Sequence, residues 1–229
     1  MTFTPSDIKI TDSILQKVEP EKMKRAFRVV TFDNFYKLFN EDEINFIKQI
    51  LTIDPITYGF KGRSFGISDV PQDLVEITEQ KYQLNGSEQI IDTQYLPKKV
   101  YEAYQELNQS LLKKEKKNLL ILSGYRSPAY QTFVFLWYLK SYEFDLQKTI
   151  TRAALPGYSE HGFPKRQAID FITEDGKPSE ENPEDFEHTI EFNWLKENAN
   201  KFNFHLTNPR ENELGTMYEP WHWAYIVET

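Results

Sequence analysis

The segment 221–226 near the C-terminus constrains the fold most, because its side chains alternate between two kinds. Large aromatic residues alternate with a histidine, an alanine and an isoleucine, which is the two-residue period of a β-strand. We therefore expect His222 on the face opposite the aromatic side chains. Pro220 cannot continue a helix and favours an extended backbone at Glu219. A carboxylate three residues before such a histidine is typical of a general base beside a metal ligand, although a histidine in an aromatic strand, taken alone, is more often structural.

Two further segments supply candidate metal ligands. Pro156–His161 is typical of a turn that leads to a second histidine. Gln167–Ile172 predicts an apolar strand with Asp170 in its middle, and a carboxylate there is costly to bury unless it is paired or bound to a metal. His161, Asp170 and His222 together would offer zinc three ligands and leave its fourth position for water.

A third segment, Leu119–Pro128, predicts an apolar strand that ends in a glycine-containing turn. The turn presents Arg126, whose charge suits an oxyanion or a polarised carbonyl, although a surface salt bridge is the plainer role. With Glu219 as an unligated carboxylate, these residues make a complete set for metal-assisted hydrolysis of an amide.

The motifs resemble those of the VanY-type D-alanyl-D-alanine carboxypeptidases. These zinc peptidases belong to a wider group that includes D-Ala-D-Ala dipeptidases and the Hedgehog-type fold. The resemblance covers about residues 93–227, in the family's order. The segments that carry it are Ser123–Ser127 with Gln131, Pro156–His161, Ala168–Asp170 and Glu219–Trp223.

The resemblance implies a zinc ion bound by His161, Asp170 and His222, with Glu219 as the general base. It also implies that Arg126 stabilises the oxyanion or holds the scissile carbonyl. The implied reaction is hydrolysis of D-Ala-D-Ala or related bonds in peptidoglycan stem peptides, so the implied partner is such a peptide.

Three more residues are implied to contact the peptide's backbone or its terminal carboxylate. They are Gln131, Ser159 and Ser127. The residue types alone leave another role open, since Gln131 could simply face solvent on its helix.

The chain departs from the family pattern at three places. The aspartate follows the first histidine by nine residues rather than the usual seven, and Arg166 stands where a glycine is usual. Asn203 replaces a glycine, although asparagine tolerates a left-handed backbone, and Ala224 replaces an arginine. The ligand types survive, so we expect the altered loop Gly162–Arg166 to bulge outward and to affect substrate choice rather than metal binding.

Two other classes of protein remain as alternatives. Two histidines and an aspartate also form the site of non-haem iron oxygenases, but their histidine and carboxylate usually lie two residues apart. The other alternative is a peptide-binding module of the same fold that has lost catalysis, which the altered loop would permit.

Composition fits a soluble enzyme. With 27 basic and 35 acidic residues the net charge is −8, so we expect no nucleic-acid partner. The chain has no cysteine, which excludes disulfides and thiolate zinc sites. From the sequence we expect neither a signal peptide nor a membrane span. We expect a monomer, either cytoplasmic or in a bacterial cell envelope after loss of a signal.

The remaining pattern predicts an α+β fold, with helices packed on a small, mainly antiparallel sheet that carries the metal. Residues 1–90 are expected as a segment packed on, or appended to, a catalytic domain at 91–229. The elements expected elsewhere are a helix at 40–51 capped by Asn40 and Glu43, loop and short strand at 59–73, a helix from Leu96 with a stripe to Leu111, a helix at 128–142 with core aromatics, a surface loop at 175–185 and a helix at 186–201.

Overall fold

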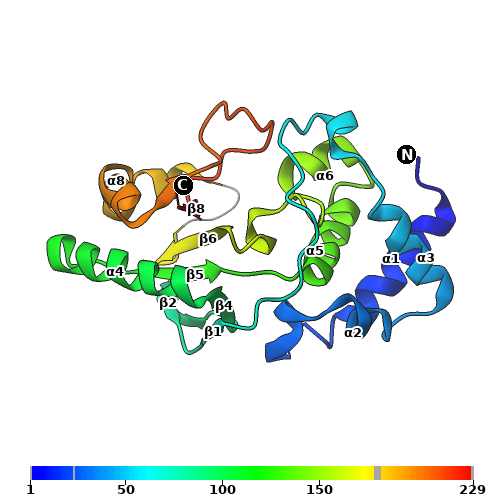
Figure 1. Ribbon diagram of the computed structural model, residues 1–229, viewed down its shortest axis with the longest axis horizontal. Coiled ribbons are helices and arrows are strands. Elements are labelled where there is room, and N and C mark those ends of the chain that lie inside the picture. Colours follow the sequence, from blue (N-terminus) through cyan, green and yellow to red (C-terminus); the bar gives the residue numbers. More distant parts are fainter. Residues whose placement is uncertain (1, 23, 178–181, 228–229) are drawn as a thin grey trace. The chain divides into compact units, whose positions relative to one another are not determined.

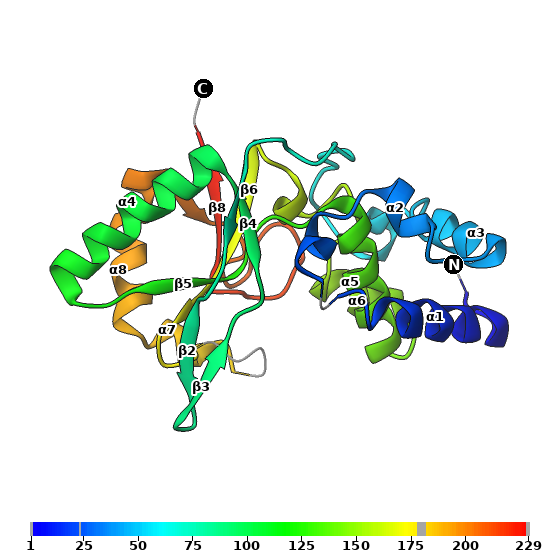
Figure 2. The same cartoon turned by 90° about the horizontal axis from the view of Figure 1, so that it is seen from below.

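The computed structural model describes residues 2–22, 24–177 and 182–227, and its contacts divide the chain into two compact units (Figure 1, Figure 2). The first comprises Met1–Val70, Arg126–Gly162 and Glu213–Met217, and the second comprises Pro71–Tyr125, Phe163–Asn212 and Tyr218–Thr229. Each unit has its own hydrophobic core. The expected division into an N-terminal segment at 1–90 and a catalytic domain at 91–229 stays a prediction.

The first unit is helical. Helix α5 (Pro128–Ser141) contacts α1 (Pro5–Val18), α2 (Phe32–Tyr36), α6 (Leu146–Arg152) and the 3-10 helix η1 (Arg25–Val29). The unit also contains α3 (Glu41–Ile50) and the 3-10 helices η2 (Pro55–Tyr58) and η3 (Glu160–Gly162). Helix α5 begins as predicted, because proline fits the first turn, where no N–H partner is needed. Most of its aromatic side chains lie in or against the core, but Trp137 is 49% exposed and does not.

Helix α3 confirms the predicted capping box. The Asn40 side chain accepts from the Glu43 N–H, and the Glu43 carboxylate accepts from the Asn40 N–H. Glu43 is nevertheless buried, and it receives hydrogen bonds of 2.7 and 2.8 Å from Lys17 and of 2.6 Å from Ser13 on α1. Burial alone would raise the pKa of the Glu43 carboxyl, but the bonds from Lys17, Ser13 and Asn40 outweigh it and hold the pKa below its ordinary value.

Replacing Lys17 by Met should destabilise the protein by about 2 kcal/mol, because the buried Glu43 carboxylate then loses its charged donor. Urea unfolding at pH 7 measures the change. The matched control is Lys22→Met, whose partner Glu19 is largely exposed, and it should cost less than about 0.5 kcal/mol. A carboxyl whose pKa is lowered on folding stabilises the protein at pH values above its pKa in the unfolded state. This stabilisation is lost as the pH falls through its pKa in the folded state. The difference between wild type and Lys17→Met should therefore shrink below about pH 4. Equal stability of the two Lys→Met variants would contradict this account.

The second unit is built on a four-stranded antiparallel sheet in the order β5-β6-β8-β7. Its strands are β5 (Leu119–Ser123), β6 (Arg166–Thr173), β7 (Phe204–Leu206) and β8 (His222–Ile226). Helices α4 (Lys98–Glu115) and α8 (Ile190–Asn198) contact each other and cover one face of this sheet (Figure 2). The predicted α+β class and small antiparallel sheet are confirmed.

The two faces of β6 and β8 differ in kind. Ile169 lies opposite Trp223, and both belong to the core that α4 and α8 cover. The next pair in the ladder is Asp170 with His222, since Asp170 follows Ile169 on β6 and His222 precedes Trp223 on β8. Because successive side chains on a strand point to opposite faces, the aromatic core and this polar pair lie on different sides of the sheet. The expected position of His222 is thus confirmed.

Two smaller antiparallel pairs complete the second unit. They are β1 (Leu74–Ile77) with β4 (Gln94–Pro97), and β2 (Lys81–Leu84) with β3 (Ser87–Ile90). After β5, a Cβ at Gly124 would lie 2.4 Å from the Tyr95 carbonyl oxygen. Only glycine therefore lets the chain pass β4 on its way to Arg126.

The prediction of a single helix over residues 186–201 is wrong. The short helix α7 (Glu184–Glu187) ends before Thr189, whose hydroxyl accepts from the Phe192 N–H and starts α8. The 3-10 helix η4 (Ala199–Phe202) follows, and Asn203 ends it with φ 63°. The left-handed backbone expected at Asn203 is confirmed, whereas the helix breaks because a threonine offers an N-cap inside the segment.

Three further expectations need adjustment. The stretch 59–73 contains no strand, since β1 begins at Leu74. Leu96 lies on β4, although the rest of its predicted stripe is buried along α4 as expected. The expected loop 175–185 lies partly outside the described residues, and its last two residues begin α7.

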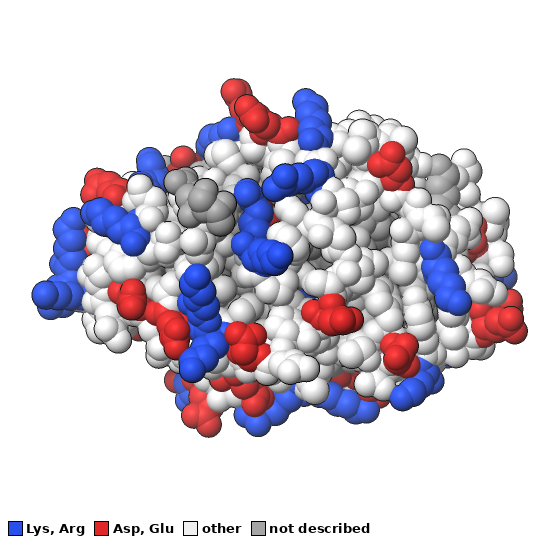
Figure 3. Space-filling model, in the orientation of Figure 1, with Lys and Arg blue, Asp and Glu red and all other residues white. Residues whose placement is uncertain are grey.

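Lys and Arg are interspersed with Asp and Glu on the face drawn in Figure 3. Within residues 2–22, 24–177 and 182–227, no helix combines the length and the apolar character needed to cross a membrane.

Candidate metal centre

The register of the sheet brings Asp170 and His222 together, because they lie directly opposite each other on β6 and β8. Asp170 Oδ1 and His222 Nδ1 are 2.9 Å apart. The His222 side chain is buried, and its backbone N–H donates to the Glu219 carbonyl at 3.0 Å. The start of β8 is thereby tied to the residue that we predicted to be the general base.

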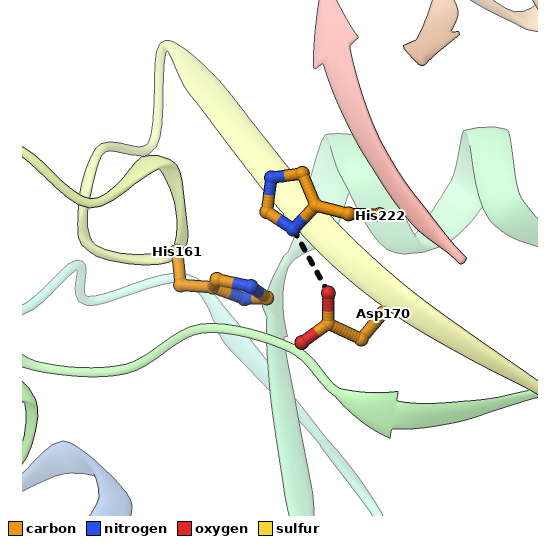
Figure 4. Close-up of side chains that lie close together, drawn as sticks. All are labelled: His161, Asp170 and His222. Atoms are coloured by element: carbon orange, nitrogen blue, oxygen red, sulfur yellow. Dashed lines mark hydrogen bonds and ion pairs between the residues drawn. The ribbon is translucent and has the colours of Figure 1, made fainter. Parts of the chain in front are cut away.

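The third predicted ligand, His161, lies on η3 and is 3% exposed. The ligand atoms of His161, Asp170 and His222 all lie within 4.8 Å of one another (Figure 4). Among the residues that the structure describes, these three form one group of metal-ligating side chains. The three side chains predicted as ligands therefore lie together in the structure, although they come from three separate elements.

The donor set fits a zinc ion. Zinc bonds of about 2.0–2.1 Å in a tetrahedron place neighbouring donor atoms about 3.3 Å apart. Asp170 Oδ1 and His222 Nδ1 are 2.9 Å apart, and all three ligand atoms lie within 4.8 Å of one another. Two neutral imidazoles and one carboxylate leave the ion a net positive charge. Three protein ligands also leave one position for water or substrate, as a catalytic rather than a structural zinc site requires.

Glu219 is held by Asn208, a residue that nothing in the sequence pattern singles out. The Glu219 N–H donates to the Asn208 carbonyl at 3.0 Å, and Asn208 Nδ2 donates to Glu219 Oε2 at 2.6 Å. Asn208 is buried. The Asn208-Pro209 pair is a turn signal, but such a signal says nothing about a partner eleven residues away.

A second contact holds the neighbouring residue, Tyr218. The Arg210 guanidinium carbon lies 4.3 Å from the centre of the Tyr218 ring, and Arg210 Nη2 bonds Glu187 at 2.6 Å and Glu184 at 3.2 Å. Burial, and then the Glu187 carboxylate, raises the pKa of Tyr218 to about 12. The residue before Glu219 is therefore a neutral phenol at physiological pH, packed against a cation.

Arg126 is oriented by Gln131 on α5. Arg126 Nη1 donates to Gln131 Oε1 at 3.2 Å, and Gln131 Nε2 donates to the Ala154 carbonyl at 2.8 Å. Gln131 is 2% exposed, so it does not face solvent from its helix. The backbone N–H of Arg126 also donates to the His161 carbonyl at 3.0 Å. Arg126 is thus fixed both to the segment of a candidate ligand and to a buried amide.

Both predicted serines are buried. Ser127 caps α5, with its hydroxyl accepting from the Tyr130 N–H at 3.1 Å. Ser159 precedes η3, and its carbonyl accepts from the Gly162 N–H at 3.2 Å. These bonds are local and structural, and the expected contacts of both serines with substrate stay predictions.

The lengthened connection before Asp170 is a short turn. Strand β6 begins at Arg166, whose N–H donates to the Phe163 carbonyl at 2.9 Å and whose strand partner is Ile226. Lys165 is exposed in the turn. The connection between η3 and β6 is therefore the turn at 163–165, and Arg166, which we had placed in the bulge, belongs to the sheet.

Two curated relatives resemble the chain in sequence. It is 28% identical over 160 residues to a D-alanyl-D-alanine carboxypeptidase of Enterococcus faecium, covering 69% of this chain and 46% of the relative. It is 29% identical over 176 residues to the inferred carboxypeptidase YodJ of Bacillus subtilis (strain 168), covering 68% of this chain and 61% of YodJ. The chain thus spans about half to three fifths of the length of these curated relatives.

The solved structure of the LdcB LD-carboxypeptidase, described for its recognition of peptidoglycan, is similar to this chain. The TM-score is 0.53 at 28% identity, with 68% of this chain and 69% of LdcB covered. Residues 93–228, more than half of the chain, match the family model described as VanY, D-alanyl-D-alanine carboxypeptidase. This range holds all three candidate ligands and Glu219, and the chain belongs to the VanY family of D-alanyl-D-alanine carboxypeptidases.

Proposed function

We propose that the protein is a zinc-dependent peptidase that hydrolyses D-Ala-D-Ala or a related bond in the stem peptides of peptidoglycan. The observation that carries this proposal is the grouping of His161, Asp170 and His222 in a chain of this family. The names of two relatives support the substrate class, since one is a D-alanyl-D-alanine carboxypeptidase and the other an LD-carboxypeptidase. Those names differ in the bond, which therefore has to be identified by experiment.

The proposed reaction divides the chemistry between the metal and Glu219. Zinc, held by His161, Asp170 and His222, would lower the pKa of the attacking water and polarise the scissile carbonyl. Glu219 would take the proton from that water and deliver it to the departing amine as the C–N bond breaks. The hydrogen bond from the His222 N–H to the Glu219 carbonyl supports this role, because it keeps base and ligand on one rigid segment.

Four residues are proposed to bind the peptide. Arg126 would stabilise the oxyanion or hold the scissile carbonyl, and its bond to the buried Gln131 supports a fixed direction for its guanidinium. Gln131 and Ser159 would reach the terminal carboxylate or the peptide backbone. Ser127 would contact the same peptide from the start of α5.

Mass spectrometry of muropeptides before and after incubation with the zinc-loaded protein tests the proposal. Loss of one alanine from a pentapeptide stem would identify a D-Ala-D-Ala carboxypeptidase, and loss of the last residue of a tetrapeptide stem would identify LD activity. An unchanged muropeptide profile, with zinc bound, would favour the inactive binding module instead.

We also predict that the turn at 163–165 shapes substrate choice. Removing two residues from it should leave zinc content unchanged but alter KM by about threefold or more for at least one stem peptide, because the turn adjoins the strand that carries Asp170. Elemental analysis and kinetics on tetrapeptide and pentapeptide stems measure the two effects. The milder variant Lys165→Ala tests the charge alone. Identical kinetics for both variants across the peptides would leave the turn as a solvated connection.

A further inference from the structure

Asn208 and Glu219 form a reciprocal pair at the entrance to β8. One bond joins the Glu219 N–H to the Asn208 carbonyl at 3.0 Å, and the other joins Asn208 Nδ2 to Glu219 Oε2 at 2.6 Å. Fixing a backbone and a side chain to the same partner restricts both the position of the residue and its rotamer. Pro220 removes further freedom from the backbone on the other side of Glu219.

The segment that carries Asn208 is itself anchored. It follows β7, which pairs with β8, so the Asn208–Glu219 contact lies just beyond the last pair of these two strands. Two residues later, Arg210 packs on Tyr218 and bonds Glu184 and Glu187. The carboxylate of Glu219 is thus held by a residue whose own position is fixed on both sides.

We propose that Asn208 is the positioning residue of the general base. Its side-chain amide holds one carboxylate oxygen of Glu219, so that the carboxylate keeps the orientation in which it takes a proton from the attacking water. The role rests on the proposed peptidase function. An asparagine suits it because its amide donates to a carboxylate without adding a charge beside the metal ligands.

Two substitutions test the proposal by steady-state kinetics on the stem peptide that the wild type cleaves. Asn208→Ala should lower kcat by about 10- to 100-fold and change KM by less than about threefold, because the bond orients the base rather than the substrate. Asn208→Asp preserves the shape, removes the donor and places a second carboxylate next to Glu219, so kcat should fall at least as far. Zinc content should stay at the wild-type value in both variants.

Asn212→Ala is the matched control. Asn212 lies four residues further along the same connection, and its Nδ2 donates to the Pro209 carbonyl at 3.1 Å. The same truncation there should change kcat by less than about twofold. A fall in kcat for Asn212→Ala equal to that for Asn208→Ala would show that the loop, not the amide, is responsible, and would overturn the proposal.

Two further results would decide whether Asn208 positions the general base. A kcat for folded, zinc-loaded Asn208→Ala or Asn208→Asp within about threefold of wild type overturns the proposal. If the wild type cleaves no stem peptide, the peptidase function fails, and crystal structures of the wild type and Asn208→Asp then test the positioning alone. A Glu219 carboxylate in the same place in both structures would overturn it, whereas a displaced carboxylate would support it.

Discussion

Replacing Glu219 by Gln should lower turnover of the stem peptide by a factor of about 10² to 10⁴ and leave the bound zinc in place. The substitution preserves the length and shape of the side chain but removes the proton acceptor. Glu219 is not among the three grouped ligands, so the metal should remain. Asn208 can still bond the amide oxygen of the new residue, which keeps the local structure close to that of the wild type.

Kinetics and elemental analysis on the same preparation measure both effects. Glu211→Gln is the matched control, because Glu211 is an exposed carboxylate, and its turnover should stay within about twofold of wild type. If zinc-loaded Glu219→Gln turns over at the wild-type rate, another group is the base. If the variant loses its zinc, Glu219 is a ligand and our assignment of the three ligands is wrong.

Replacing His222 by Ala should abolish stoichiometric zinc and, with it, turnover. A residue that only supports a metal ligand typically costs about 10- to 100-fold in affinity when it is removed, and the loss of a ligand should exceed that. The variant also removes the contact of 2.9 Å between His222 Nδ1 and Asp170 Oδ1. Two ligands would then remain where zinc requires at least three from the protein.

Competition with a chromophoric chelator measures the zinc affinity. The matched control is His205→Ala on β7, since His205 faces Ala224 across the sheet and does not belong to the ligand group. Its affinity for zinc should equal that of the wild type. Zinc binding by His222→Ala at wild-type affinity would exclude His222 as a ligand, and equal losses in both histidine variants would point to general destabilisation.

The strand alternation at 221–226 predicted the face on which His222 lies, because a two-residue period assigns each side chain to one side of a sheet whatever the neighbouring strand. The stripe along α4 was predicted for the same kind of reason, since its spacing is a property of the helix alone. The candidate ligands followed from residue type and motif. What the period could not supply was the register, which places Asp170 opposite His222 and depends on two strands that lie far apart in the sequence.

The errors came from contacts that local patterns do not encode. Thr189 ends one helix and starts another because its hydroxyl caps α8, and a cap of this kind competes with helical periodicity without changing it. Trp137 sits in an aromatic-rich helix but is 49% exposed, since richness in aromatics does not tell which face is covered. Asn208 was missed because its partner is distant in sequence.

The antiparallel pairing of β6 with β8 also determines where the length of this chain can vary. One residue inserted within either strand would shift the pairing by one step and place an apolar side chain where a ligand now stands. Residues inserted in the turn at 163–165, which precedes the first paired residue Arg166, would leave Asp170 opposite His222. Natural or engineered insertions that preserve the site should therefore be confined to the connections, and length differences between related chains should map there.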